Sequence, residues 1–181
     1  EQLLMATWSE PDLVIDLFDR LMESSYMYGE HLSRMGIGYV FVEDATCSPE
    51  VNTPEGLERF DLSFLSKIIS NFRSKGVRSI VHNCNERPYL DGYLKMDLDA
   101  LHIIPKAENR KEVYDKFRSR TTVVGGIDQM FLLFKGTPAQ VEAEVRGMMN
   151  DWGNDPGFMI APGCEMAFKT PVENIIAFRE A

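Results

Sequence analysis

Short apolar runs alternate with longer segments of helical periodicity along the chain. The runs are rich in Val, Ile and Phe and predict strands near residues 39–42, 77–81, 100–104, 121–125 and 158–160. Between them, apolar residues recur at the spacing of one face of an amphipathic helix. About five strands alternating with roughly six helices indicate a parallel sheet covered by helices. No repeat and no flexible linker interrupts the pattern, so one domain is expected over residues 1–181.

Several expected helices carry recognisable start signals. A capping box needs a hydroxyl residue followed three positions later by an acid, and two are predicted, at Ser9/Asp12 and at Thr170/Glu173. Proline in the first turn marks further starts, at Thr53-Pro54 and at Thr137-Pro138. These signals fix where the helices should begin relative to the strands.

Composition is that of an ordinary soluble globular protein. Hydrophobic residues make up 44% of the 181 residues and charged residues 26%, enough for one domain with a core. No run of about eighteen apolar residues and no signal-peptide pattern occurs, so a cytoplasmic protein is expected. The formal net charge of -9 argues against nucleic-acid or anionic-membrane partners, which call for basic patches.

The cysteines and one histidine suggest a metal site. Cys47, Cys84 and Cys164 are too few for a disulfide framework, which favours free thiols or metal ligands. His82 and Cys84 end an apolar run two residues apart, so in a strand they point to the same side and can share one ion. Cys164, which ends another apolar run, is the best third ligand. A Cys2His set that leaves one position open is typical of catalytic zinc, and the alternative is a buried histidine beside unrelated thiols.

Other polar residues also follow predicted strands. Asp44, His102 and Asp128 lie at or just after strand ends, where a (β/α) barrel builds its active site, whereas an open doubly wound sheet would collect a ligand at one switch point. The alternative role of Asp44 is a helix-capping or loop carboxylate, and that of His102 is a core histidine with a backbone partner. Cys47 is expected to be a plain buried thiol.

Several segments resemble the uroporphyrinogen decarboxylase superfamily, and the resemblance spans nearly the whole chain. They are Gly125-Gly126-Ile127-Asp128, Gly136-Thr137-Pro138, Ala161-Pro162-Gly163-Cys164-Glu165 and Thr170-Pro171-Val172-Glu173-Asn174. In addition, Glu43-Asp44-Ala45-Thr46-Cys47-Ser48-Pro49 resembles the Asp-Ala-Thr-Gly-Ser-Pro stretch of the methylcobalamin:coenzyme M methyltransferase branch. The resemblance implies an α/β fold, the C-terminal part of a TIM-type (β/α)8 barrel with about five βα units.

The resemblance also implies a function. True decarboxylases of the superfamily work without metal, whereas His82, Cys84 and Cys164 are similar to the zinc motif of its thiol methyltransferases. Such an enzyme uses zinc to activate a thiol, which takes a methyl group from methylcobalamin or a corrinoid protein. Coenzyme M and tetrahydrofolate are the acceptors considered. Asp44 and Asp128 are candidates for orienting the metal ligands or the substrate.

Two departures from the family pattern leave alternatives open. Relatives often place a glutamate ligand on the strand after His-x-Cys, where this chain has His102-Ile103-Ile104, so the fourth ligand is not assigned. The chain also covers only about the C-terminal half of the barrel, so it is either part of a longer chain or a half-barrel that pairs with its missing half or with itself. The alternatives to the methyltransferase are a metal-free decarboxylase-type lyase and a noncatalytic barrel fragment.

Overall fold

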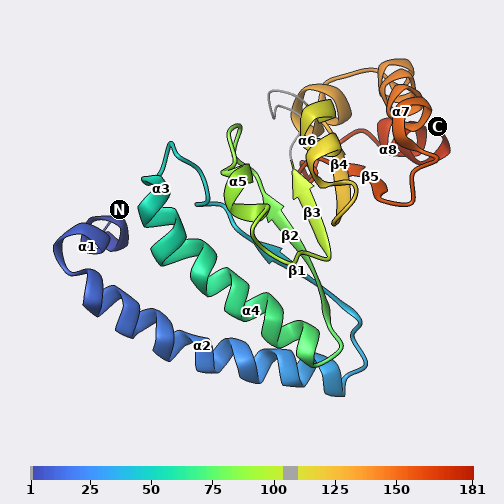
Figure 1. The fold of residues 1–181 in the computed structure, drawn as a ribbon. Helices are drawn as coiled ribbons and strands as arrows, with labels where there is room; N and C mark the ends of the chain where they lie inside the picture. Colours follow the sequence, from blue (N-terminus) through green and yellow to red (C-terminus); the bar gives the residue numbers. More distant parts are fainter. Residues whose placement is uncertain (1, 104–109) are drawn as a thin grey trace.

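The computed structural model describes residues 2–103 and 110–181, and these residues form a parallel sheet with helices between consecutive strands (Figure 1). Five strands lie in the order in which they occur along the chain, and each pairs with the next in parallel. They are β1 (Tyr39–Glu43), β2 (Arg78–Asn83), β3 (Ala100–Ile103), β4 (Thr122–Ile127) and β5 (Phe158–Pro162). The predicted alternation of strands and helices is confirmed. Ile104, the last residue of the predicted third strand, and Asn109, where the next helix is expected to begin, lie outside the described residues.

The helices differ from the prediction mainly in number and length. The α-helices are α1 (Gln2–Ser9), α2 (Pro11–Arg34), α3 (Pro54–Leu57), α4 (Ser63–Ser74), α5 (Leu90–Tyr93), α6 (Arg110–Phe117), α7 (Pro138–Trp152) and α8 (Val172–Glu180). Two single turns of π-helix, η1 (Glu58–Leu62) and η2 (Gln129–Phe134), accompany them. Among the described residues, no helix is both long and apolar enough to cross a membrane.

The two helix starts predicted at Thr53-Pro54 and Thr137-Pro138 are confirmed. Thr137 forms a full capping box with Gln140, and the Thr53 hydroxyl accepts a hydrogen bond from the Gly56 amide. The capping boxes predicted at Ser9 and Thr170 are wrong. Ser9 ends α1 and its hydroxyl donates to the Met5 carbonyl, while the N-cap position of α2 is Glu10. The Thr170 hydroxyl donates to the Ala167 carbonyl, the N-cap position of α8 is Pro171, and neither helix has a side-chain cap.

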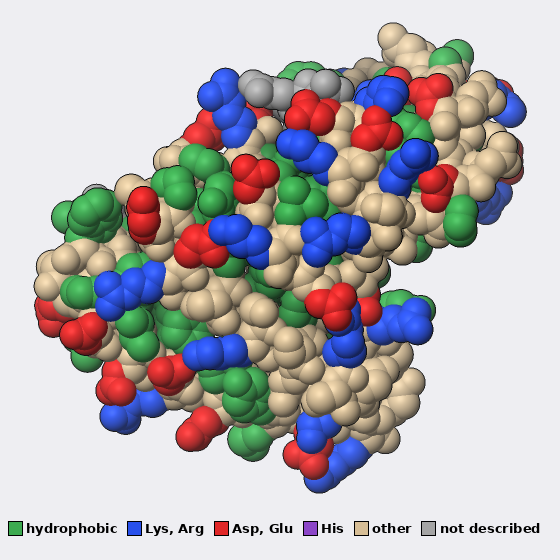
Figure 2. All heavy atoms as spheres, viewed as in Figure 1, with side chains coloured by type: hydrophobic (Ala, Val, Ile, Leu, Met, Phe, Trp, Pro, Cys, Tyr) green, Lys and Arg blue, Asp and Glu red, His purple; other side chains and the backbone are tan. Residues whose placement is uncertain are grey.

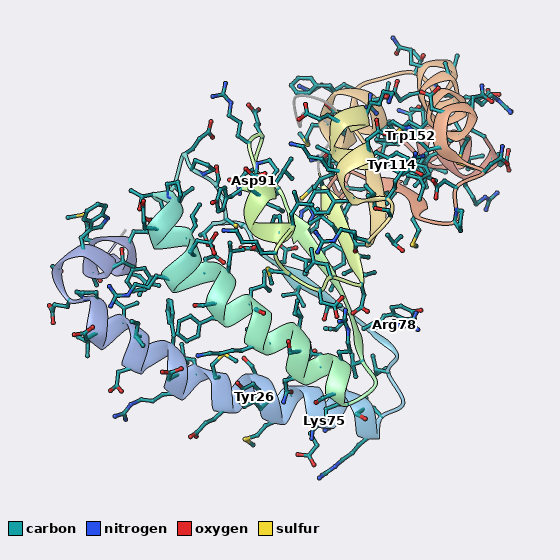
Figure 3. The ribbon with its side chains drawn as sticks, in the orientation of Figure 1. Tyr26, Lys75, Arg78, Asp91, Tyr114 and Trp152 are labelled. Carbon is teal, nitrogen blue, oxygen red and sulfur yellow. The ribbon has the colours of Figure 1, made fainter. Side chains whose placement is uncertain are left out.

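Helices cover one face of the sheet. Outward-pointing strand residues such as Val81, Leu101 and Val123 pack with α4 and α6 in the largest core cluster. A second cluster joins β4, η2 and α7 to α8. Between α6 and α7, Tyr114 and Trp152 stack with ring centroids 5.1 Å apart (Figure 3). Figure 2 shows acidic and basic side chains interspersed over one face of the molecule, without a continuous basic patch.

The opposite face of the sheet, here called the inner face, is only partly covered. Alternation along the strands assigns it the residues Tyr39, Phe41, Glu43, Ile80, His82, Ala100, His102, Val124, Gly126, Met159 and Ala161. Tyr39, Phe41 and Met159 are 62%, 49% and 52% exposed, which is unusual for apolar residues of a parallel sheet. Strands β1 and β5 each have one neighbour within the described sheet, so each has an open edge.

Candidate metal centre

His82 lies on the inner face near the carboxyl end of β2 and is 1% exposed. Its ring centroid lies 5.4 Å from that of Phe41 and 4.6 Å from that of His102. Neither ring nitrogen has a hydrogen-bond partner among the described residues. Burial lowers the pKa of His82, so the ring is held in the neutral form that binds metals. An imidazole with two buried, unpartnered nitrogens fits the chemistry of a metal ligand.

The two candidate thiolate ligands come from opposite parts of the sheet. Cys84 directly follows β2, and Cys164 follows β5 after Gly163, whose amide donates to the Ile127 carbonyl at 2.7 Å. Both thiols are partly exposed. Burial is the main cause that raises the pKa of Cys84, and the charge of Cys164 is the second. The fold therefore brings the two thiols within electrostatic reach of each other at one rim of the sheet.

Glu165, the residue after Cys164, has a smaller effect on His82, because its negative charge raises the His82 pKa. Among the described residues, however, His82, Cys84 and Cys164 do not have all three ligand atoms within 4.8 Å of one another. The three residues thus share one rim, in an arrangement more open than that of ligands gathered on an ion. Nitrogen and sulfur donors of this kind suit zinc.

His102 has the backbone partner considered in the sequence analysis. Its Nε2 donates to the Pro162 carbonyl at 2.8 Å, while its Nδ1 is buried without a partner. Burial, with the charge of His82 as a smaller cause, lowers the pKa of His102 to about 4. His102 is therefore a neutral histidine held by the backbone. His102 begins the segment His102-Ile103-Ile104, and the last residue of that segment lies outside the described residues.

Asp128 directly follows β4 at the same rim and caps the next element. One of its carboxylate oxygens accepts hydrogen bonds from the amides of Met130 and Phe131, at 2.9 and 2.7 Å. This carboxylate thereby caps the first turn of η2. Both of these hydrogen bonds go to the same carboxylate oxygen, Oδ1 of Asp128.

Asp44 follows β1 but points away from the inner face. Its backbone amide donates to the His82 carbonyl at 2.8 Å, which ties it to the strand that carries the candidate ligands. Its carboxylate instead accepts a hydrogen bond from the Tyr93 hydroxyl on the helix-covered side. There, ligand atoms of Asp44, Cys47 and Asp61 lie within 4.8 Å of one another. Cys47 is buried, as expected, but it belongs to an acidic cluster that the sequence analysis missed.

The charges in this cluster raise one another's proton affinity. Burial raises the pKa of Asp44, and burial together with the nearby Asp44 charge raises that of Asp61 to about 7. The same causes raise the pKa values of Cys47 and Tyr93. The raised pKa values of the two carboxyl groups favour a proton on this pair.

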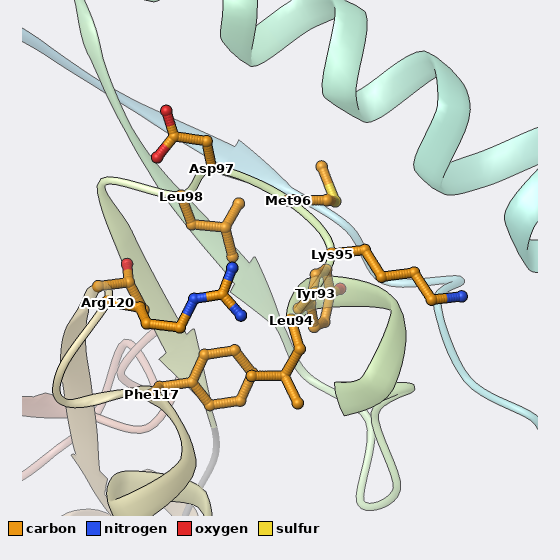
Figure 4. A pocket seen from close by; sticks show the side chains of 9 residues that line it. Tyr93, Leu94, Lys95, Met96, Asp97, Leu98, Phe117 and Arg120 are labelled. Atoms are coloured by element: carbon orange, nitrogen blue, oxygen red, sulfur yellow. The ribbon is translucent and has the colours of Figure 1, made fainter.

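Two hollows accompany these groups. One of about 660 Å³ is lined mainly by apolar residues of α2 and α4, with Asp44 and Asp61 in its wall. A smaller one of about 250 Å³ lies near the amino ends of β3 and β4, where Leu94, Phe117 and Arg120 line it (Figure 4). Because Cys84 and Cys164 follow the carboxyl ends of their strands, the smaller hollow is not part of the candidate metal centre.

Comparisons with known proteins agree with this architecture. The chain is 28% identical over 179 residues to the methylcobamide:CoM methyltransferase MtaA of Methanosarcina barkeri, covering 94% of this chain and 49% of that protein. It is 24% identical over 167 residues to the methylcobamide:CoM methyltransferase MtbA of Methanosarcina mazei, covering 91% and 47%. The chain thus spans about half the length of the curated relatives it matches.

A solved structure described as a methyltransferase from Methanosarcina mazei superposes with a TM-score of 0.86. The superposition covers 98% of this chain and 51% of the other, at 24% sequence identity, so it shows a shared fold. The expected fold, an α/β sheet from a uroporphyrinogen decarboxylase-like barrel, is confirmed. The family profile of uroporphyrinogen decarboxylase (URO-D) matches residues 1–181, and the chain therefore belongs to that family.

Proposed function

We propose that this chain is the metal-bearing part of a cytoplasmic, zinc-dependent methyltransferase that moves a methyl group from a methylated corrinoid to a thiol or a similar acceptor. The observation that supports the proposal is that both His82 nitrogens are buried without a partner among the described residues, while Cys84 and Cys164 follow the carboxyl ends of β2 and β5. Relatives named methylcobamide:CoM methyltransferases support this reaction class. Coenzyme M and tetrahydrofolate are the proposed acceptors, and a corrinoid protein is the proposed donor.

The residues present fit a zinc ion. His82 offers a neutral imidazole, and Cys84 and Cys164 offer two sulfurs, while one position stays open for the acceptor. Bound zinc would remove the proton of a thiol acceptor, whose ordinary pKa of about 8.5 keeps it mostly protonated at neutral pH. Two thiolate ligands would balance the charge of the ion, so the acceptor sulfur keeps its nucleophilic character.

Asp44 and Asp128 would act around this centre. Asp128 directly follows β4 at the rim, and one of its carboxylate oxygens accepts the hydrogen bonds from η2, which leaves the other to orient an acceptor. Asp44 reaches the centre only through the backbone, because its amide holds the His82 carbonyl while its side chain lies on the helix-covered side. Asp128 is thus the better placed of the two for contact with substrate.

Metal content tests the proposed ligands. Cys84→Ser and Cys164→Ser should each reduce bound zinc from about one ion per chain to a small fraction, because a Cys2His set loses one of its three protein ligands. Cys47→Ser is the matched control: it removes a third cysteine, on the other side of the sheet, and should leave zinc unchanged. Elemental analysis of the purified variants measures this. Full zinc in both ligand variants would rule out the site.

Thiol binding separates the methyltransferase from the lyase. When the acceptor thiol is added to the zinc-loaded protein, X-ray absorption at the zinc edge should show one more sulfur neighbour, because the open position receives the substrate sulfur. Methylthioethers of the same acceptors are the control, since their alkylated sulfur is a weaker ligand. A metal-free protein that decarboxylates porphyrinogens would instead support the lyase.

Assembly is the remaining part of the proposal. The open edges of β1 and β5 and the exposed Tyr39, Phe41 and Met159 of the inner face suit a second half-barrel. We expect the isolated chain to associate with itself, or with the N-terminal half of its barrel when that is supplied. Light scattering over a dilution series should show the mass rising with concentration. A chain that stays monomeric at micromolar concentration, with its backbone amides protected from hydrogen exchange, would contradict this expectation.

A further inference from the structure

We propose that His102 is a positioning residue that holds the Cys164 segment in place opposite His82. The proposal rests on the proposed metal centre, but it concerns a residue that has a task of its own. His102 lies on β3, in register with His82 on β2 and with Val124 on β4. Cys164 follows β5, two strands away. The backbone ladder relates the ends of β2 and β5 only through the two strands between them.

The hydrogen bond of His102 makes that link. Its Nε2 donates to the carbonyl of Pro162, sixty positions along the chain and two residues before Cys164. Strand β4 lies between the two, pairing with β3 through Val124 and with β5 through Ile127. The imidazole thus spans β4 on the inner face and ties β3 directly to the end of β5. This is a contact between non-neighbouring strands, so it adds a constraint that sheet pairing does not supply.

The other side of the His102 ring contacts the proposed ligand. The ring centroids of His102 and His82 are 4.6 Å apart with an angle of 36° between the planes, and Phe41 packs against both rings. This packing uses neither nitrogen of His82. His102 therefore supports the His82 ring by contact while leaving its nitrogens available to a metal.

A glycine on β4 allows the same closure. A Cβ atom at Gly126 would lie 2.4 Å from the Cα of Gly163 and 3.0 Å from the Ile103 carbonyl oxygen. The backbone that leads to Cys164 therefore packs directly on Gly126, and the hydrogen bond from His102 to Pro162 holds it there. The hydrogen bond from His102 holds Pro162, and the close approach of Gly126 involves Gly163, so both contacts lie immediately before Cys164.

His102 is better suited to this task than to ligation. Its Nε2 already donates to the Pro162 carbonyl, whereas His82 has both ring nitrogens without a partner among the described residues. Residues that orient a metal ligand without touching the ion typically change metal affinity by about 10- to 100-fold when they are replaced. That range sets the expected effect.

The test uses cobalt(II) in place of zinc, because its absorption reports how many thiolates bind. His102→Leu should weaken cobalt affinity roughly 10- to 100-fold and diminish the sulfur-to-cobalt charge-transfer band, as Cys164 drifts from the centre. His102→Gln keeps an N–H donor near the position of Nε2 and should restore most of both signals. His31→Gln, an exposed histidine on α2, is the control and should behave as the wild type.

A second measurement needs no metal. In the metal-free protein, the rate at which diamide joins Cys84 to Cys164 as a disulfide reports how closely the two thiols are held. His102→Leu should slow this reaction, His102→Gln should largely restore it, and circular dichroism should show that both variants are folded. Unchanged disulfide formation and an unchanged cobalt spectrum in folded His102→Leu would overturn the proposal. If the wild type binds no cobalt but the disulfide rates differ, the metal function fails and the positioning role of His102 stands.

Discussion

Gly126→Ala is expected to destabilise the protein by about 1 to 3 kcal/mol, the usual cost of forcing extra volume into a packed site. The added methyl group would meet the backbone of Gly163 at 2.4 Å, and backbone cannot turn aside as a flexible side chain can. The end of β5 would have to move away from β4, taking Cys164 with it. Chemical denaturation measures the loss, and zinc content measured on the same samples should fall as well.

Gly147→Ala is the matched control for this substitution. Gly147 is exposed inside α7, and a Cβ atom there would have no other atom within 4 Å. Alanine in a helix interior is more favourable than glycine by about 0.5 to 1 kcal/mol, so this variant should be slightly more stable than the wild type. Equal effects of the two substitutions would mean that the close approach at Gly126 does not constrain β5.

The sequence was sufficient for the order of elements and less reliable for their ends. The apolar runs predict the five strands because a parallel strand covered by helices reads as a continuous hydrophobic stretch. The capping boxes predicted at Ser9 and Thr170 are absent because each helix has its N-cap position one residue later, at Glu10 and at Pro171. Spacing in the sequence does not locate a helix end to a single residue.

The candidate site shows the same division. Alternation along β2 predicts that His82 and Cys84 point to the same side, and the structure places His82 on the inner face. The same alternation along β1 places Glu43 on the inner face and the next residue, Asp44, on the helix-covered side, where the structure has it. What spacing could not supply is the arrival of Asp61 and Tyr93 from η1 and α5, because tertiary packing sets those contacts.

One strand connects the metal centre to the acidic cluster. On β2, His82 points to the inner face, while the next residue, Asn83, points to the helix side, where its amide donates to the Cys47 carbonyl and to the Tyr93 hydroxyl, each at 2.9 Å. The His82 carbonyl accepts from the Asp44 amide. Hydrogen bonds thus connect the backbone and Asn83 of β2 to the acidic cluster on the helix side of the sheet.

Asp61→Asn should remove a pH dependence of folding stability. In the folded protein, burial and the charge of Asp44 raise the pKa of Asp61 to about 7, whereas an unfolded aspartate titrates near 3.9. Between these values the folded state holds a proton that the unfolded state has released, so stability is greatest below about pH 4 and is lost as pH rises through 7. Over that range this group should reduce the free energy of unfolding by on the order of 4 kcal/mol.

Asparagine keeps an oxygen that can accept the hydrogen bond from the Thr46 hydroxyl, but it carries no charge. Asp61→Asn should therefore be more stable than the wild type at pH 8 and similar to it near pH 4. The control is Asp115→Asn, which removes an exposed carboxylate whose pKa is lowered by Lys111 and should leave the wild-type slope between pH 5 and pH 8 in place. Urea denaturation at several pH values measures the slopes. Parallel curves for the wild type and Asp61→Asn would show that the two carboxyl groups do not share a proton, and the acidic cluster would then need a cation to offset its charge.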